Sequence, residues 1–202
     1  IPALVLVGLI LRLTGAVQRP LDGDEGVILL IANGDISHVL AAAARDVHPP
    51  LFHLLTSAVL AVGGVSQLTL RLVSIVAGTI VVALGPALAR RMQANPLLAT
   101  ALLATSPFLI YVSQDARMYS LLGLLTIASW LLLMNVWHEP TRLTRWASWS
   151  LVTLALVLTH HLGWVVFVAE VIAIVAWQRD VFRRPWHWVG AALLIVVGYA
   201  SL

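Results

Sequence analysis

The chain has 202 residues, of which 60% are hydrophobic and only 10% are charged, and its mean hydropathy is +0.96. A soluble domain carries about 25% charged residues, so this composition excludes an ordinary soluble fold and indicates a polytopic membrane protein. The net charge of +3 is too small to indicate a nucleic-acid partner. The absence of cysteine excludes disulfides and thiolate metal sites.

The predicted fold class is all-α, because apolar stretches of membrane-spanning character follow one another along the chain. A spanning helix needs about 20 apolar residues, with a range of roughly 17–25. The stretch 51–62 is too short to cross and is expected to lie at the membrane interface. Arg12 is expected to reach the interface from the end of the first span, and Pro107 to kink the third. The predicted spans are residues 1–17, 68–89, 97–112, 118–137, 146–159, 162–178 and 186–202.

The distribution of arginine among the loops predicts the orientation of these spans, because cytoplasmic loops are enriched in basic residues. Three loops are rich in arginine: Arg90 with Arg91, Arg142 with Arg145, and Arg179 with Arg183 and Arg184. Placing all three on the cytoplasmic side requires that 51–62 does not cross the membrane. Residues 18–66 then form a long first extracytoplasmic loop that carries interfacial helices. Six of the nine acidic residues lie on that side.

The first acidic motif, "DGDEG" at residues 22–26, directly follows the first span. Asp24 and Glu25 open an apolar, helical stretch, where carboxylates are favoured by the helix dipole. They are therefore either a helix cap at the membrane surface or a general base held close to a lipid substrate. Asp22 and Asp24 also have a D-x-D spacing, which could bind a divalent cation through oxygen atoms. Two carboxylates alone are weak evidence for a metal.

A second charged motif, "SQDARMYSLL" at residues 113–122, lies in the outer turn between two spans. Asp115 and Arg117 are two residues apart and do not share a helix face, so a mutual salt bridge is not the expected arrangement. Arg117 either reaches the interface or binds a phosphate through paired hydrogen bonds. Glu170, in the middle of its span, is expected to pair with Arg71 or with another buried donor.

Histidines mark two further outer turns, "RDVHPPLFHLL" at residues 45–55 and "LTHHLGW" at residues 158–164. His48 precedes Pro49 and Pro50, which start a helix after an extended entry. This segment either forms a rigid corner or contributes His48 to a binding pocket. His160 and His161 are either an interfacial polar turn or place one imidazole toward a site, because neighbours on a helix point about 100° apart.

In this order, "DGDEG", "HPPLFHLL", "LLATSPFLIYVSQDARMYSLL" and "LVLTHHLGWVVF" resemble the membrane glycosyltransferases of the GT-C class. The most similar group comprises protein O-mannosyltransferases, aminoarabinose transferases and their bacterial relatives. The resemblance implies a GT-C-type helical bundle of which residues 1–202 are the N-terminal part. It also implies sugar transfer, with inversion at the sugar carbon, from a polyprenyl-phosphate donor on the extracytoplasmic face of the plasma (inner) membrane. The acceptor would be a protein, a lipid or a glycan.

The resemblance also implies roles for individual residues. Asp24 would be the catalytic base, supported by Glu25, and Arg117 would hold the donor phosphate with Tyr119 packed nearby. The remaining pocket residues would be His48, Gln114, Asp115 and His160. No cofactor is expected, because arginine can stabilise a lipid monophosphate leaving group. The spacing of Asp22 and Asp24 leaves the binding of a divalent cation as an alternative. The alternative is a transporter or flippase of an anionic lipid or lipid-linked sugar, although the inverted repeats common in transporters are not found.

Overall fold

The computed structural model describes residues 1–177 and 185–200, and every regular element within these ranges is a helix. This confirms the predicted all-α class. The chain divides into two compact units, residues 1–124 and 125–202, with the boundary inside α8. The helices are α1 (Pro2–Ala16), α2 (Gly23–Ala32), α3 (Ile36–Ala43), α4 (Leu51–Gly63), α5 (Gln67–Arg91), α6 (Pro96–Thr105), α7 (Pro107–Ser113), α8 (Tyr119–His138), α9 (Leu143–Thr159), α10 (Leu162–Trp177) and α11 (Pro185–Ala200).

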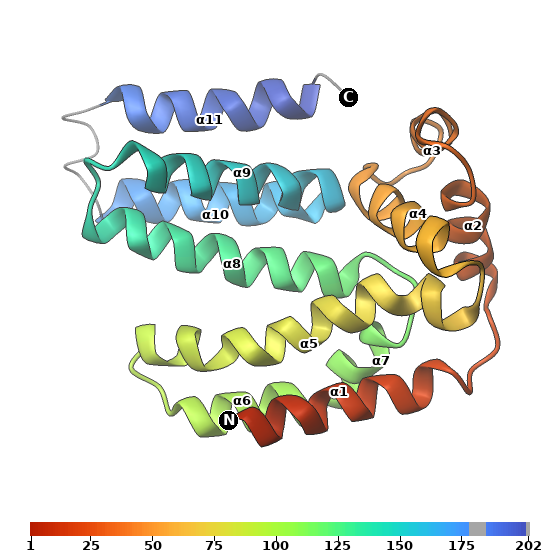
Figure 1. The fold of residues 1–202 in the computed structure, drawn as a ribbon. Coiled ribbons are helices and arrows are strands. Elements are labelled where there is room, and N and C mark those ends of the chain that lie inside the picture. Colours follow the sequence, from red (N-terminus) through yellow and green to blue (C-terminus); the bar gives the residue numbers. More distant parts are fainter. Residues whose placement is uncertain (178–184, 201–202) are drawn as a thin grey trace. The chain divides into compact units, whose positions relative to one another are not determined.

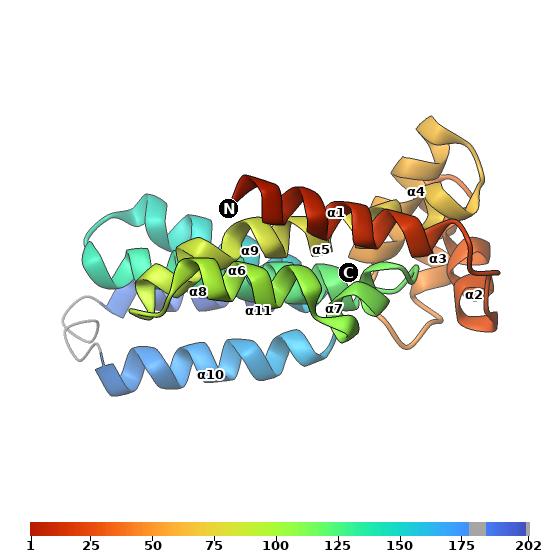
Figure 2. The same cartoon turned by 90° about the horizontal axis from the view of Figure 1, so that it is seen from below.

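The first unit is built around α5, which packs against α1, α4, α6 and α7. The short helices α2, α3 and α4 contact one another and gather at the end of this unit where α1 ends and α5 begins (Figures 1 and 2). A capping box formed by Ser66 and Thr69 starts α5. The connection between α1 and α2, the start of α5 and the turn between α7 and α8 are thereby brought to one end of the unit.

Two of the described helices, α5 and α8, are long and apolar enough to cross a membrane. A third candidate is the pair α6 and α7, which is bent by 56° at its break. The break lies at Ser106 and Pro107, where the sequence predicts a kink. The other apolar helices, α1, α4, α9, α10 and α11, have 10–17 residues. The short length predicted for 51–62 agrees with α4, whereas the crossings predicted for 1–17, 146–159, 162–178 and 186–202 stay predictions.

Arg12 does not reach the interface, and that prediction is wrong. Its side chain is fully buried. Pro107 has no N–H, so the last carbonyls of α6 lack their usual helical partners. Arg12 supplies the missing donors: Nη2 donates to the Leu103 carbonyl at 3.2 Å and Nη1 to the Ala104 carbonyl at 3.4 Å. Its Nε also donates to Ser113 Oγ at 3.2 Å. Arg12 therefore stabilises the break between α6 and α7.

The second unit contains most of α8 with α9, α10 and α11, and α9 packs against both α10 and α11. Glu170 accepts a hydrogen bond from Trp149 Nε1 at 3.1 Å, so its partner is a buried donor other than Arg71. Arg142 and Arg145 both pair with Glu139 in the turn before α9. The third arginine-rich loop, with Arg179, Arg183 and Arg184, lies outside the described residues. The buried apolar core consists of Leu133, Val136, Trp146, Trp149, Val157, Ile174, Ala191 and Ile195.

Candidate active site

The acidic motif after α1 forms the start of α2. Asp22 Oδ1 accepts a hydrogen bond from the Glu25 backbone N–H at 2.9 Å, and Glu25 Oε2 accepts one from the Asp22 backbone N–H at 3.3 Å. This reciprocal capping box satisfies two donors of the helix terminus. The cap is therefore made by Asp22 and Glu25. Asp24, between them, extends its carboxylate toward Arg117.

Glu25 is fully buried and is held by three separate segments of the chain. Arg71, also fully buried, donates from Nε to Glu25 Oε1 at 2.6 Å and from Nη2 to Oε2 at 2.5 Å. The backbone N–H of Ala116 donates to Glu25 Oε1 at 2.9 Å. Such two-point contacts between a guanidinium and a carboxylate fix both distance and orientation. Glu25 thus ties α2 to α5 and to the turn between α7 and α8.

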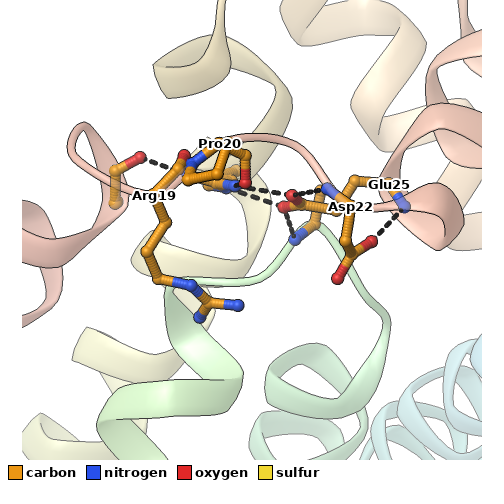
Figure 3. A network of polar contacts seen from close by, with 7 residues as sticks. Arg19, Pro20, Asp22 and Glu25 are labelled. Carbon is orange, nitrogen blue, oxygen red and sulfur yellow. Dashed lines mark hydrogen bonds and ion pairs between the residues drawn. The ribbon is translucent and has the colours of Figure 1, made fainter.

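Arg71 uses its remaining donors on the connection between α1 and α2, where Figure 3 labels Arg19 and Pro20. Nη1 donates to the carbonyls of Ala16 at 2.6 Å and Arg19 at 2.9 Å, and Nη2 donates to the carbonyl of Pro20 at 3.1 Å. A guanidinium has five N–H groups, and all five of Arg71 are used. The sequence signal for Arg71 was that it is the one charged residue within the predicted span 68–89.

The carboxylates of Asp22, Glu25 and Asp115 have oxygen atoms within 4.8 Å of one another, a spacing that could hold a metal ion. Glu25, however, already accepts four hydrogen bonds, which occupy the lone pairs of both its oxygen atoms. Burial alone would raise the pKa of Glu25, but the hydrogen bonds from Arg71 and Ala116 outweigh it and hold that pKa below its usual value. The donor set therefore fits an arginine-bound carboxylate better than a metal ligand.

Asp115, the third carboxylate of this group, lies in the non-helical turn between α7 and α8. Its side chain is 9% exposed, and within the described residues its Oδ1 has no hydrogen-bond partner. Burial raises the pKa of Asp115 to about 6, and the negative charges of Glu25 and Asp22 add to that effect. A carboxyl group with such a pKa can take up or release a proton near neutral pH.

Arg117 and Asp24 form an ion pair between Arg117 Nη1 and Asp24 Oδ2. The Asp24 side chain is 71% exposed, whereas that of Arg117 is 15% exposed. The guanidinium lies 5.7 Å from the centre of the Tyr119 ring, and the Arg117 carbonyl accepts a hydrogen bond from Ser74 Oγ at 2.9 Å. The structure therefore brings Asp24, Arg117 and Tyr119 together and anchors them to α5.

The other predicted pocket residues have partners of their own. Gln114 Nε2 donates to the carbonyl of Leu11 at 2.7 Å and so attaches the turn to α1. His48 Nδ1 lies 3.1 Å from Asp46 Oδ2, in the corner before α4. His160 belongs to the second unit, where Nδ1 accepts a hydrogen bond from the Leu162 backbone N–H at 3.0 Å. A pocket role for these three residues stays a prediction.

Arg19, which the sequence reasoning did not single out, also lies at this end of the first unit. Its guanidinium lies 4.7 Å from the centre of the Tyr111 ring. Figure 3 shows its side chain extending downward from the connection, while Asp22 and Glu25 lie to the right. The sequence signal for Arg19 was its position as a basic residue three positions before the acidic motif.

A family model matches most of the chain. Residues 47–201 match the family model described as dolichyl-phosphate-mannose-protein mannosyltransferase. No curated protein and no solved structure matches the chain. The match includes Arg71, Asp115, Arg117 and Tyr119, while Asp24 and Glu25 precede it. Since it spans most of the chain, and since the helices are those of an integral membrane protein, the chain belongs to the dolichyl-phosphate-mannose-protein mannosyltransferase family of glycosyltransferases.

Proposed function

We propose that this protein transfers a sugar of the mannose class from a polyprenyl-phosphate donor to an acceptor hydroxyl, with Asp24 as general base. The observation that carries the proposal is the pairing of the exposed Asp24 carboxylate with Arg117. This pair places a proton acceptor beside a guanidinium, which is well suited to bind phosphate. The family supports a lipid-linked donor and a protein acceptor.

The chemistry is a single displacement. The acceptor hydroxyl gives its proton to Asp24, and its oxygen attacks the anomeric carbon. The bond from that carbon to the phosphate oxygen breaks, its electron pair stays on that oxygen, and the carrier leaves as a phosphate monoester. Attack from the face opposite the leaving group inverts the anomeric carbon. Protonation of Asp24 weakens its ion pair with Arg117, so the guanidinium becomes available as charge develops on the phosphate.

An apolar groove of about 570 Å³ supports a lipid donor. It lies between α4 and α5 and ends at the first turns of α8, all within the first unit. Val73 and Ala77 line it on either side of Ser74, whose hydroxyl donates to the Arg117 carbonyl, and Leu121, in the first turn of α8, also lines it. An isoprenoid chain in this groove would therefore begin near the backbone of Arg117. The other lining residues are Leu55, Ala58, Val59, Val62, Gly63, Thr69, Leu72, Val76, Ile80 and Leu124.

The position of the site along α5 supports an extracytoplasmic location. Glu25 binds α5 at Arg71, near the start of this helix, whereas Arg90 and Arg91 lie in its last turn. The helix has 25 residues and is therefore about 37 Å long at 1.5 Å per residue. If the arginine-rich end is cytoplasmic, the site is on the opposite side of the membrane. We place it on the outer face of the plasma (inner) membrane.

A transfer assay with the full-length protein in proteoliposomes tests this function. We expect labelled mannose to pass from a polyprenyl-phosphate donor to a peptide or lipid acceptor, and EDTA to leave the rate unchanged. A nucleotide-sugar donor should give no product. Transfer only from the nucleotide sugar would contradict the proposal. Passage of the lipid across the bilayer without any glycosylated product would indicate the transporter instead.

The groove leads to a prediction about donor length. Val76→Trp places an indole in the groove, because the Val76 side chain lines it and is 46% exposed. We expect a rise in KM of about tenfold for a long-chain donor, equivalent to about 1.4 kcal/mol of lost apolar contact, and little change for a donor with a single isoprene unit. Leu6→Trp on α1, where the side chain is 58% exposed, is the matched control. An equal effect on both donors would contradict the assignment of the groove.

A further inference from the structure

The turn between α7 and α8, residues 114–118, is joined at its two ends by a pair of serine side chains. Ser120 Oγ donates to Ser113 Oγ at 3.1 Å, and both side chains are buried. Ser113 Oγ donates in turn to the carbonyl of Leu109 at 2.6 Å and accepts a hydrogen bond from Arg12 Nε at 3.2 Å. A hydroxyl has one donor and two acceptor sites, so every hydrogen-bonding position of Ser113 is used.

Arg12 holds Ser113 from α1 and carries a buried charge. Its side chain is fully buried, and none of the described ion pairs includes it. Its other described hydrogen bonds go to backbone carbonyls, those of Gly8 at 2.9 Å, Leu103 and Ala104. A buried charged donor that loses its acceptor is costly. The need to satisfy Arg12 Nε therefore keeps the Ser113 hydroxyl in place.

Gly78 on α5 leaves the space that this hydroxyl fills. A Cβ atom at position 78 would lie 2.0 Å from Ser113 Oγ, 2.9 Å from Ser113 Cβ and 3.0 Å from Arg12 Nε. The first two distances are shorter than packed atoms adopt, so any larger residue would displace the serine. Helices α1, α5 and α7 and the first turn of α8 therefore meet at one hydroxyl, which requires glycine opposite it.

The middle of the same turn is attached to other parts of the first unit. The backbone N–H of Ala116 donates to Glu25 Oε1 at 2.9 Å, and Ser74 Oγ donates to the Arg117 carbonyl at 2.9 Å. Neither contact involves the residues at the ends of the turn. The path of the backbone through Arg117, and with it the direction of the Arg117 side chain, therefore also depends on the serine pair.

We propose that Ser113 is a positioning residue for sugar transfer, which acts by keeping the Arg117 guanidinium at its place beside Asp24. Arg12 and Gly78 belong to the same arrangement, because Arg12 holds the hydroxyl and Gly78 leaves room for it. The inference rests on the proposed function, in which Arg117 stabilises the charge that develops on the leaving phosphate. A displacement of about 1 Å in such a group can lower a rate by about 10²-fold.

The test is the kinetics of mannose transfer by the full-length protein in proteoliposomes, with a polyprenyl-phosphate mannose donor. Ser113→Ala should lower kcat by about 10- to 100-fold. The KM for the donor should change by less than about threefold, because the loss concerns an interaction made in the transition state and none of the residues lining the apolar groove is altered. Gly78→Ala should lower kcat in the same range, since its methyl group displaces the serine.

Two substitutions of the same kind in the second unit are the matched controls. Ser150 is a buried serine whose hydroxyl donates to the Trp146 carbonyl of its own helix at 2.7 Å. A Cβ atom at Gly190 would have no neighbouring atom within 4 Å. Ser150→Ala and Gly190→Ala should therefore retain the kcat of the wild type.

A double variant tests whether Ser113 acts through Arg117. In Arg117→Met the side chain to be positioned is absent, so adding Ser113→Ala should lower the remaining single-turnover rate by less than about twofold. A residue with only a structural role would lower the rate by the same factor in both backgrounds. Ser113→Ala combined with Gly78→Ala should cost no more than Gly78→Ala alone, because both changes disturb one contact.

Three results would overturn the proposal. An unchanged kcat in Ser113→Ala, with transfer by the wild type intact, would remove the positioning role and leave the proposed function standing. An equal loss with and without Arg117 would make Ser113 a structural residue only. Absence of transfer by the wild type from polyprenyl-phosphate mannose would remove the proposed function and this inference with it.

Ser120→Ala keeps the proposal testable if Ser113→Ala does not fold. This change removes the hydrogen bond between the ends of the turn but leaves Arg12 with its acceptor. It should lower kcat in the wild-type background and leave the rate of Arg117→Met unchanged. A wild-type kcat in a folded Ser120→Ala variant would count against the proposal.

Discussion

Asp24→Asn is expected to lower the rate of sugar transfer by a factor of about 10²–10⁴, the usual contribution of a general base. Asparagine has the same shape as aspartate but does not accept a proton at neutral pH. The fold should be unaffected, because the Asp24 side chain is 71% exposed and the cap of α2 is made by Asp22 and Glu25. An exposed ion pair contributes about 0–1 kcal/mol, so the loss of pairing with Arg117 should be minor. Donor binding should persist, since Arg117 remains.

The measurement is the initial rate of transfer, together with the affinity for a polyprenyl-phosphate donor. Asp35→Asn is the matched control: Asp35 is an exposed carboxylate on the same loop that caps α3, and asparagine is an equally good N-cap. It should retain wild-type activity. Full transfer by Asp24→Asn would show that the carboxylate is not the base. Asp115, with its pKa of about 6, would then be the next residue to examine.

Arg71→Met is expected to reduce the free energy of unfolding by about 3–5 kcal/mol, as is typical when one partner of a buried ion pair is removed. The change leaves the buried Glu25 carboxylate without its counter-charge and removes the donors to the Ala16, Arg19 and Pro20 carbonyls. Thermal or denaturant unfolding in detergent would measure the loss. Arg90→Met, at an exposed position in the last turn of α5, is the control and should change stability by less than about 0.5 kcal/mol.

A second substitution separates the ion pair from the carbonyl contacts. Glu25→Gln combined with Arg71→Met should be less destabilising than the sum of the single changes, because the double variant has no unpaired buried charge. Strict additivity would mean that Glu25 and Arg71 do not interact. The pair also has a pH signature: it lowers the pKa of Glu25, so its stabilisation is present above the unfolded pKa of about 4.3 and is lost as the pH falls through the lowered folded value.

Much of this molecule could be predicted from local patterns. Composition and long apolar stretches indicate a helical membrane protein, and Pro107 indicates the break in the third span because a residue without N–H cannot continue the helix hydrogen bonds. The acidic motif indicates the start of a helix, but the cap expected at Asp24 and Glu25 is made by Asp22 and Glu25. The ordered motifs also identify the family, which the match over residues 47–201 confirms. These features depend on neighbours along the chain or on composition.

Other features depend on residues far apart in the sequence. Arg12 looks like a residue that reaches the interface, but it is buried because the broken helix about 90 residues later presents unpaired carbonyls to it. Glu25 pairs with Arg71, 46 residues away, and Asp24 with Arg117, 93 residues away. The choice between a helix cap and a catalytic carboxylate was open in the sequence. The fold assigns the cap to Asp22 and Glu25 and leaves Asp24 paired with Arg117, while the catalytic role of Asp24 stays a proposal.

The sequence by itself determined the helical membrane class, the break at Pro107 and the family, because each follows from composition, local hydrogen bonding or ordered motifs. Only the tertiary structure decided which charges meet: Arg71 with Glu25, Arg117 with Asp24, and Arg19 with the ring of Tyr111. The physical reason is that a buried charge must find its partner wherever packing places one. That partner is set by how α1, α2, α5 and the turn after α7 come together.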